Sequence, residues 1–185
     1  MTIEFMSDEW KKEYAAELEK RTAGSPPYIY FTPEWVDLFE KKIQGDATYK
    51  EVAKDWEGSV CLHVEPNPDM GLDIHLYVLL DLWHGDCNWA QIAPTDVGEA
   101  GDFVITGSLE RWIQVGRKQL DPVKGMMQGK LKLKGDLPAI VRAVRAATRL
   151  VELSTEVGGK MPDDLTPEET QELRDVVTTL SDKFL

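Results

Sequence analysis

The histidine and cysteine side chains of this 185-residue sequence, the residue types that bind metals or act as nucleophiles, are concentrated in one short stretch. All three histidines, His63, His75 and His84, and both cysteines, Cys61 and Cys87, lie between positions 61 and 87. If the two strands predicted there pair in register, His63 and His75 become cross-strand neighbours on a polar face. No CxxC or HExxH spacing accompanies them, so ordinary polar-face residues are favoured and we predict no metal site.

Sequence motifs that mark other reactions are missing from the chain. It contains no GxSxG nucleophile elbow, no GxxxxGK[ST] phosphate loop and no GxGxxG between a strand and a helix. We therefore predict a protein that is not an enzyme and needs no cofactor. Catalysis by the region of His63 and His75 is kept as a weaker alternative.

Positive charge is gathered in one part of an otherwise acidic chain. The formal net charge is −12, yet residues 111–150 contain ten Lys or Arg and two acidic residues. The overall charge argues against a nucleic-acid partner. The local excess indicates either an anionic partner or simply a solvated face.

The length and the terminal sequence bear on organisation and location. A chain of 185 residues suits one domain with a substantial core. No window of about 18 apolar residues occurs, and the N-terminus lacks the basic and apolar segments of a signal peptide. Two cysteines form no disulfide framework, so we predict a cytoplasmic protein.

Helices are predicted where apolar residues recur every three or four positions behind a capping residue. The predicted helices cover residues 7–22, 32–45, 46–56, 108–116, 136–158 and 166–184. In the helix that follows Asp136, Leu137, Ile140 and Val144 share one side. Arginines form a stripe beside that apolar side.

Strands are predicted where apolar and polar residues alternate. Residues 60–65, 72–82 and 88–92 are expected to form an antiparallel meander, and residues 102–107 a fourth strand. Met126 and Met127 are placed in a loop before a fifth strand over residues 128–134. Methionine adapts to irregular apolar shapes, in a core or around a ligand.

Residues 120–136 resemble the signature of the sterol carrier protein 2 (SCP-2) family. The run is Leu-Asp-Pro-Val-Lys-Gly-Met-Met-Gln-Gly-Lys-Leu-Lys-Leu-Lys-Gly-Asp. The order of helices and strands is also similar from about residue 33 to residue 154. The resemblance implies an α+β fold, with a five-stranded, mostly antiparallel sheet covered by helices that enclose an apolar tunnel. Residues 1–185 would then form a single SCP2-like lipid-binding domain, with the helices at 7–22 and 166–184 as additions to its core.

The resemblance also implies a function and a binding site. Members of the family bind or transfer fatty acids, fatty acyl-CoA, phospholipids or sterols and carry no catalytic residues. By position, the apolar wall would be formed by Phe103, Ile105, Trp112, Met126, Met127, Leu131, Leu133, Ile140 and Val144. The leading hypothesis is non-enzymatic binding or transfer of an apolar, lipid-like ligand. An accessory subunit that presents an apolar intermediate to a partner enzyme is the alternative.

The basic segment suggests how such a protein would meet its partners. Contact with an anionic membrane or with acyl-CoA phosphates is assigned to Lys130, Lys132, Lys134, Arg142, Arg145 and Arg149. Each basic residue close to an anionic membrane contributes about 1 kcal/mol, less at high salt. The oligomeric state is left open, a homodimer included.

Overall fold

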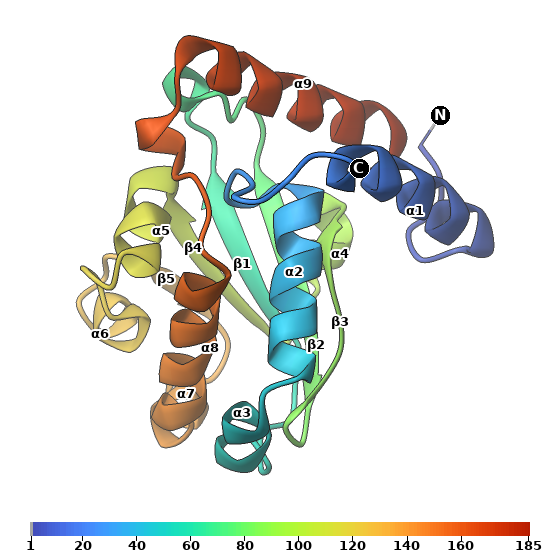
Figure 1. Cartoon of the computed structure of the whole chain (residues 1–185). Coiled ribbons are helices and arrows are strands. Elements are labelled where there is room, and N and C mark those ends of the chain that lie inside the picture. The colour runs from blue at the N-terminus through green and yellow to red at the C-terminus, as the bar shows by residue number, and fades with distance from the viewer. Residues whose placement is uncertain (1) are drawn as a thin grey trace.

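A five-stranded sheet forms the centre of the molecule in the computed structural model, which describes residues 2–185 (Figure 1). The strands are β1 (Val60–Glu65), β2 (Leu76–Trp83), β3 (Asp86–Ala93), β4 (Phe103–Ser108) and β5 (Lys132–Lys134). Their order in the sheet is β3-β2-β1-β4-β5. β1 and β4 run parallel, and the other three pairs are antiparallel. The predicted α+β fold with a mostly antiparallel sheet is confirmed.

Alternation along the strands gives the sheet two different faces. Leu62 on β1 lies opposite Val78 on β2 and Ile105 on β4, and these three side chains belong to the main core. Their neighbours Cys61, Tyr77 and Val104 point to the other face. There they form a small second cluster with Val97 of α4 (Thr95–Glu99).

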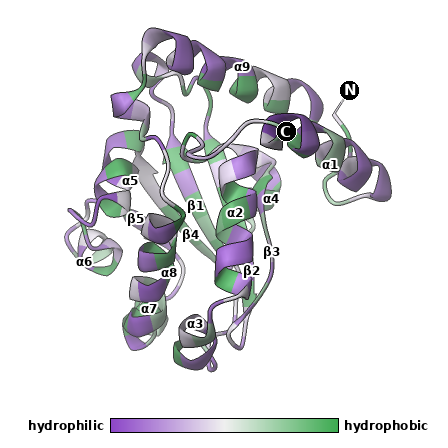
Figure 2. Ribbon diagram, viewed as in Figure 1, coloured by the Kyte–Doolittle hydropathy of each residue, from purple (hydrophilic) through white to green (hydrophobic). Residues whose placement is uncertain are grey.

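Helices cover the main-core face of the sheet. α2 (Pro33–Gln44), α5 (Leu109–Gly116) and α8 (Val144–Val157) lie across it in Figure 1, with α3 (Ala47–Val52) below α2. α2 is amphipathic, and its green, hydrophobic residues alternate with purple, hydrophilic ones in Figure 2. The N-terminal caps predicted for α3 and α5 are present: Asp46 accepts from Tyr49 N and Ser108 accepts from Arg111 N.

The signature segment differs from its prediction. Met126 and Met127 end a short helix, α6 (Pro122–Met127), rather than lying in a loop, and β5 begins at Lys132 instead of residue 128. Asp121 caps α6 by accepting from Lys124 N at 2.9 Å, and Pro122 occupies the first turn. The Asp-Pro pair therefore starts a helix, because proline is favoured at the first helical position. The predicted loop after β3 likewise contains α4.

The long helix predicted over residues 136–158 is interrupted. It is divided into α7 (Leu137–Arg142) and α8 at Ala143, whose φ and ψ are −99° and 23°. The buried side of α8 is also rotated from the prediction: Ala146 and Leu153 are buried, whereas Val144 is 40% exposed. Alanines, rather than the bulkier valine, therefore face the sheet.

The two terminal helices pack on the same domain. α9 (Pro167–Lys183) begins with the predicted capping box between Thr166 and Glu169. Phe184, which follows it, is fully buried against Trp10 and Tyr14 of α1 (Asp8–Thr22). Two short 3₁₀ turns, Pro68–Met70 and Pro162–Asp164, complete the regular structure. Within residues 2–185, no helix combines the length and the apolar character needed to cross a membrane.

Candidate functional site: an apolar cavity under α8

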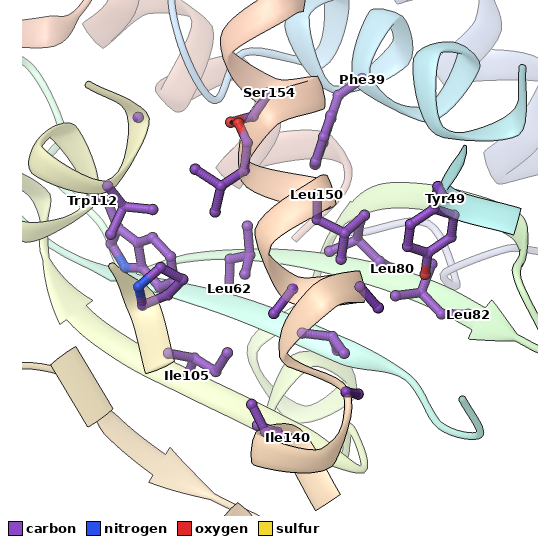
Figure 3. Close-up of a pocket in the computed structure, with 18 of the residues that line it drawn as sticks. Phe39, Tyr49, Leu62, Leu80, Leu82, Ile105, Trp112, Ile140, Leu150 and Ser154 are labelled. Atoms are coloured by element: carbon purple, nitrogen blue, oxygen red, sulfur yellow. Dashed lines mark hydrogen bonds between the residues drawn. The ribbon is translucent and has the colours of Figure 1, made fainter. Parts of the chain in front are cut away.

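A cavity of about 110 Å³ lies between the sheet and the helices that cover it. Figure 3 shows α8 crossing over it, with Trp112 and Tyr49 at opposite sides of the labelled group. The sheet contributes Val60, Leu62, Leu80, Leu82 and Ile105 to the lining; α8 contributes Ala146, Ala147, Leu150, Val151 and Ser154; the other helices contribute mainly Phe39, Tyr49, Trp112, Met126 and Ile140. Among the described residues, no Lys, Arg, His, Asp or Glu lines it.

Small side chains at the start of α8 account for the empty space. Ala143, Ala146 and Ala147 recur at helical spacing and all line the cavity. Leu80, Leu82 and Trp112 line the sheet and α5 sides. Protein interiors are normally packed without voids larger than a water molecule. Alanines at positions where leucines would fill the gap leave the helix supported at its later turns, by the fully buried Leu153, and hollow at its first ones.

Most polar atoms in the lining already have partners on the protein backbone. The Tyr30 hydroxyl donates to Ser154 O at 3.0 Å. The indole nitrogens of Trp35, Trp56 and Trp112 donate to Gly158 O, Gly58 O and His63 O at 2.7, 2.8 and 3.0 Å. A ligand therefore meets these side chains mainly as apolar surface.

Four of the nine residues predicted for the apolar wall line this cavity: Ile105, Trp112, Met126 and Ile140. Met127 is 66% exposed and lies outside it. Successive helical residues point about 100° apart, so only one of the two methionines can face inward. The loop expected there would have left both free to do so.

The other predicted wall residues are packed elsewhere. Leu131 is buried beside Gly107, close enough that a Cβ on this glycine would lie 2.5 Å from it. Phe103 packs on Trp56 with ring centroids 4.8 Å apart, and Leu133 is half-buried at the sheet edge opposite Ile105. Val144 faces outward because the buried side of α8 is rotated. The sequence reasoning missed the alanines of α8 and Tyr49; the regular alanine spacing was the available signal.

The six predicted docking cations fall into different environments. Lys130, Arg142 and Arg145 are exposed, and Arg142 lies 3.8 Å from Asp136. Lys132 and Lys134 flank Leu133 on β5 and so point to the opposite face of the sheet, where Lys134 donates to Glu99 O. These two are therefore separated from the other cations by the sheet itself.

Arg149 is not a free surface cation. Its guanidinium donates to both carboxylate oxygens of Asp46, at 2.9 and 2.6 Å, and to Glu152 and Glu156. The side chains of Arg149 and Asp46 are 19% and 15% exposed. Since Asp46 caps α3, this ion pair fastens α8 to the helix that carries Tyr49.

The two predicted histidine neighbours do meet, on the face of the sheet away from the cavity. His63 Nε2 lies 2.9 Å from His75 Nδ1, and the His63 ring stacks on Tyr77 with centroids 4.2 Å apart. Burial, and then the neighbouring His75, lowers the pKa of His63. No group of three or more His, Cys, Asp or Glu residues arranged to hold a metal ion is found within residues 2–185.

The two cysteines are free and buried. Burial raises the pKa of both Cys61 and Cys87 to about 12. Their thiols are protonated at neutral pH, which makes them poor nucleophiles.

Comparison with known proteins places this architecture. The sequence model of the SCP-2 sterol transfer family matches residues 38–146, from within α2 to within α8. The chain belongs to this family. The crystal structure of a sterol carrier protein 2 is 37% identical to it, with a TM-score of 0.63, and the match covers 69% of this chain and 98% of the other.

A second solved structure in the SCP-2 group comes from Thermus thermophilus, a conserved hypothetical protein described as a candidate sterol carrier protein. It is also 37% identical, with a TM-score of 0.65, covering 74% of this chain and 95% of the other. A search of curated proteins returned no significant match. α1 and α9 lie outside the region that the SCP-2 family model matches.

Proposed function

We propose that this protein binds an apolar, lipid-like molecule in the cavity under α8 and carries it without transforming it. The observation that carries the proposal is the cavity itself, which is enclosed by apolar side chains and free of charged ones in the described part of the chain. Membership of the SCP-2 family supports it, as does the 37% identity to a protein described as sterol carrier protein 2. Fatty acids, fatty acyl-CoA, phospholipids and sterol-like molecules are the candidate ligands.

The size of the cavity bears on how such a ligand would enter. Ligand pockets in proteins usually measure about 300–1,000 Å³, so a cavity of about 110 Å³ has to widen for a long chain. The interruption at Ala143 lets α7 move relative to α8, and Ile140 and Ala143 both line the cavity. Each buried CH₂ group contributes about 0.8 kcal/mol, which rewards such widening.

Filling the cavity tests the proposal. Ala146→Leu adds three carbon atoms at a buried position that lines the space. We expect the variant to lose the ligand that co-purifies with the wild-type protein, as seen by native mass spectrometry and lipid extraction. We also expect the free energy of unfolding to increase by as much as about 2 kcal/mol, because the added carbons replace a void.

Thr148→Leu is the matched control, since it adds apolar bulk on the exposed side of the same helix. Ala147→Leu is a second filling variant, in case the side chain at position 146 strains the core. Full ligand occupancy in both filling variants would contradict the proposed site.

We further propose that the rim of the cavity docks on an anionic lipid surface. α6, α7 and the first turn of α8 present the exposed apolar residues Met127, Val141 and Val144. Lys130, Arg142 and Arg145 are exposed on the same segment of the chain. Apolar side chains flanked by basic ones are the features with which proteins bind anionic interfaces.

The accessory-subunit alternative stays a prediction. It assigned the docking of a partner to the terminal helices. α9, however, buries Leu173, Val176, Val177 and Leu180 against its own domain. The apolar side of this helix is therefore already covered.

A further inference from the structure

The hydroxyl of Tyr49 differs from the other polar groups that line the cavity. The Tyr49 side chain is 1% exposed and belongs to the lining. The hydroxyls of Tyr30 and Ser154 and the three indole nitrogens each bond a backbone carbonyl. Tyr49 takes part through its backbone N–H, which donates to Asp46, but its hydroxyl makes no hydrogen bond with any residue from 2 to 185.

The position of this hydroxyl makes it accessible to a molecule inside the cavity. Figure 3 shows Tyr49 reaching down from α3 with its oxygen directed toward Leu82, on the opposite side of the site from Trp112. Leu82 itself lines the cavity. A buried polar group without a partner costs free energy, and structures usually supply one, in the protein, as water or as a ligand.

No charged side chain of the described residues faces this hydroxyl. Burial is the main cause that raises the pKa of Tyr49, with the nearby Cys87 as the other. Cys87 is itself protonated, since burial raises its pKa to about 12. The phenol is therefore a neutral O–H donor at physiological pH. Arg149, which is paired with the cap of the same helix, is fully engaged by Asp46, Glu152 and Glu156.

These conditions select the chemistry of the buried end of a ligand. An ionised carboxylate or phosphate there would have one neutral donor and no counter-charge, and burying such an ion is costly. A pure hydrocarbon would leave the hydroxyl without a partner. An uncharged oxygen accepts from the phenol while the rest of the molecule meets apolar walls.

We infer that the ligand places an uncharged oxygen, that of an alcohol, ketone or ester, against Tyr49 and its hydrocarbon body toward Trp112. This inference rests on the proposed function and narrows its ligand class. Fatty acids would then have to bind with the carboxylate away from α3. Tyr49 acts here as a specificity-determining residue.

A series of eight-carbon probes tests the inference: octane, octan-1-ol, octan-2-one and octanoate, titrated calorimetrically into the full chain. We expect Tyr49→Phe to weaken octan-1-ol and octan-2-one by roughly 2- to 12-fold, the value of one net hydrogen bond. Octane and octanoate should bind the variant as they bind the wild type, or slightly better. Because the lost hydroxyl had no partner, the thermal midpoint should not fall.

Tyr30→Phe is the matched control, because its hydroxyl is already bonded to Ser154 O. It should lower stability and change the affinity of all four probes by a similar factor. Equal binding of octan-1-ol to wild type and Tyr49→Phe would overturn the inference while leaving the cavity function intact. A loss for octanoate as large as that for octan-1-ol would also overturn it. If the wild type bound none of the probes, the proposed function would fail and the inference with it.

Discussion

Glu34 illustrates, at the scale of single residues, how one motif can have two different environments. The sequence Thr-Pro-Glu opens both α2, as Thr32 to Glu34, and α9, as Thr166 to Glu168. Glu168 is exposed, whereas Glu34 is 6% exposed and its Oε2 has no hydrogen-bond partner among the described residues. Burial is the main cause that raises the pKa of Glu34.

Replacing this carboxylate should stabilise the protein at neutral pH. For an acid whose folded-state pKa is raised, the folded protein binds the proton more tightly, so stability falls as pH rises from about 4.3 through the raised pKa. We expect Glu34→Gln to increase the free energy of unfolding at pH 7 by about 1 kcal/mol, and the gain to shrink toward pH 4. Urea unfolding across this range measures it.

Glu168→Gln serves as the control, since it removes a charge from the same position of a helix without burial. It subtracts the favourable effect of an acid near a helix N-terminus. A Glu34→Gln variant that is less stable than wild type at pH 7 would show that the carboxylate has a partner.

Single positions were also where sequence reasoning reached its limit in the site. Ile105, Trp112, Met126 and Ile140 were correctly expected near one another, since they lie on predicted apolar faces. Tyr49 was expected to be core because its spacing matched a buried helix face. The fact that its hydroxyl lacks a partner depends on which side chains surround it, and no local pattern encodes that.

α8 carries the main lesson at the scale of elements. The sequence offers two candidate apolar rows along this helix, one with Val144 and Val151 and one with Ala143, Ala146 and Leu150. Hydrophobicity favoured the valine row. The structure buries Ala146 and leaves Val144 40% exposed, because close packing against a sheet depends on side-chain size as well as on polarity.

The link between α8 and α3 is the ion pair of Arg149 with Asp46. The hydrogen bond from Arg149 is the main cause that lowers the pKa of Asp46. The stability that this pair contributes is present above the ordinary aspartate pKa of about 3.9 and is lost as pH falls through the lowered value. Asp46→Asn should therefore destabilise the protein at pH 7, with a difference from wild type that disappears as the pH falls below about 4.

Asparagine also caps helices, so the Asp46→Asn variant removes charge while the start of α3 is kept. Asp37→Asn is the control, since its i,i+4 pair with Lys41 on α2 is largely exposed at the lysine and should contribute little. Urea midpoints of both variants at several pH values decide the matter. Equal losses for the two variants would mean that the α3–α8 pair has no special role.

Charge is distributed unevenly over the whole molecule, and this asymmetry can be tested. Arg142→Glu with Arg145→Glu changes the charge at the rim of the cavity, and Lys11→Glu with Lys12→Glu makes the same change on α1. α1 and α7 lie at opposite ends of the molecule in Figure 1. We expect the rim variant to lose at least about tenfold in binding to vesicles that contain anionic lipid, at about 1 kcal/mol for each cation removed.

The α1 variant should bind these vesicles nearly as the wild type does, and neither protein should respond when the vesicles contain neutral lipid alone. Sedimentation with the vesicles at low and moderate salt gives the measurement, with weaker binding at the higher salt. Equal losses in the two variants would indicate a general effect of net charge rather than a docking surface.

The order of the elements and the five-stranded sheet could be predicted for the whole chain, because alternation, helical spacing and capping residues are local. The signature around Met126 and Met127 identified the family. The interruption at Ala143 and the burial of Phe184 by α1 depend on contacts between segments far apart in the sequence. Their geometry therefore had to come from the structure.

The empty space under α8 also gives the molecule an unusual response to compression. Proteins with internal voids occupy more volume folded than unfolded, by about 20–100 mL/mol. Hydrostatic pressure favours the state of smaller volume, so it acts against the hollow form of this fold. A bound ligand replaces that void with matter, and the filled protein should consequently withstand pressures that unfold the empty one.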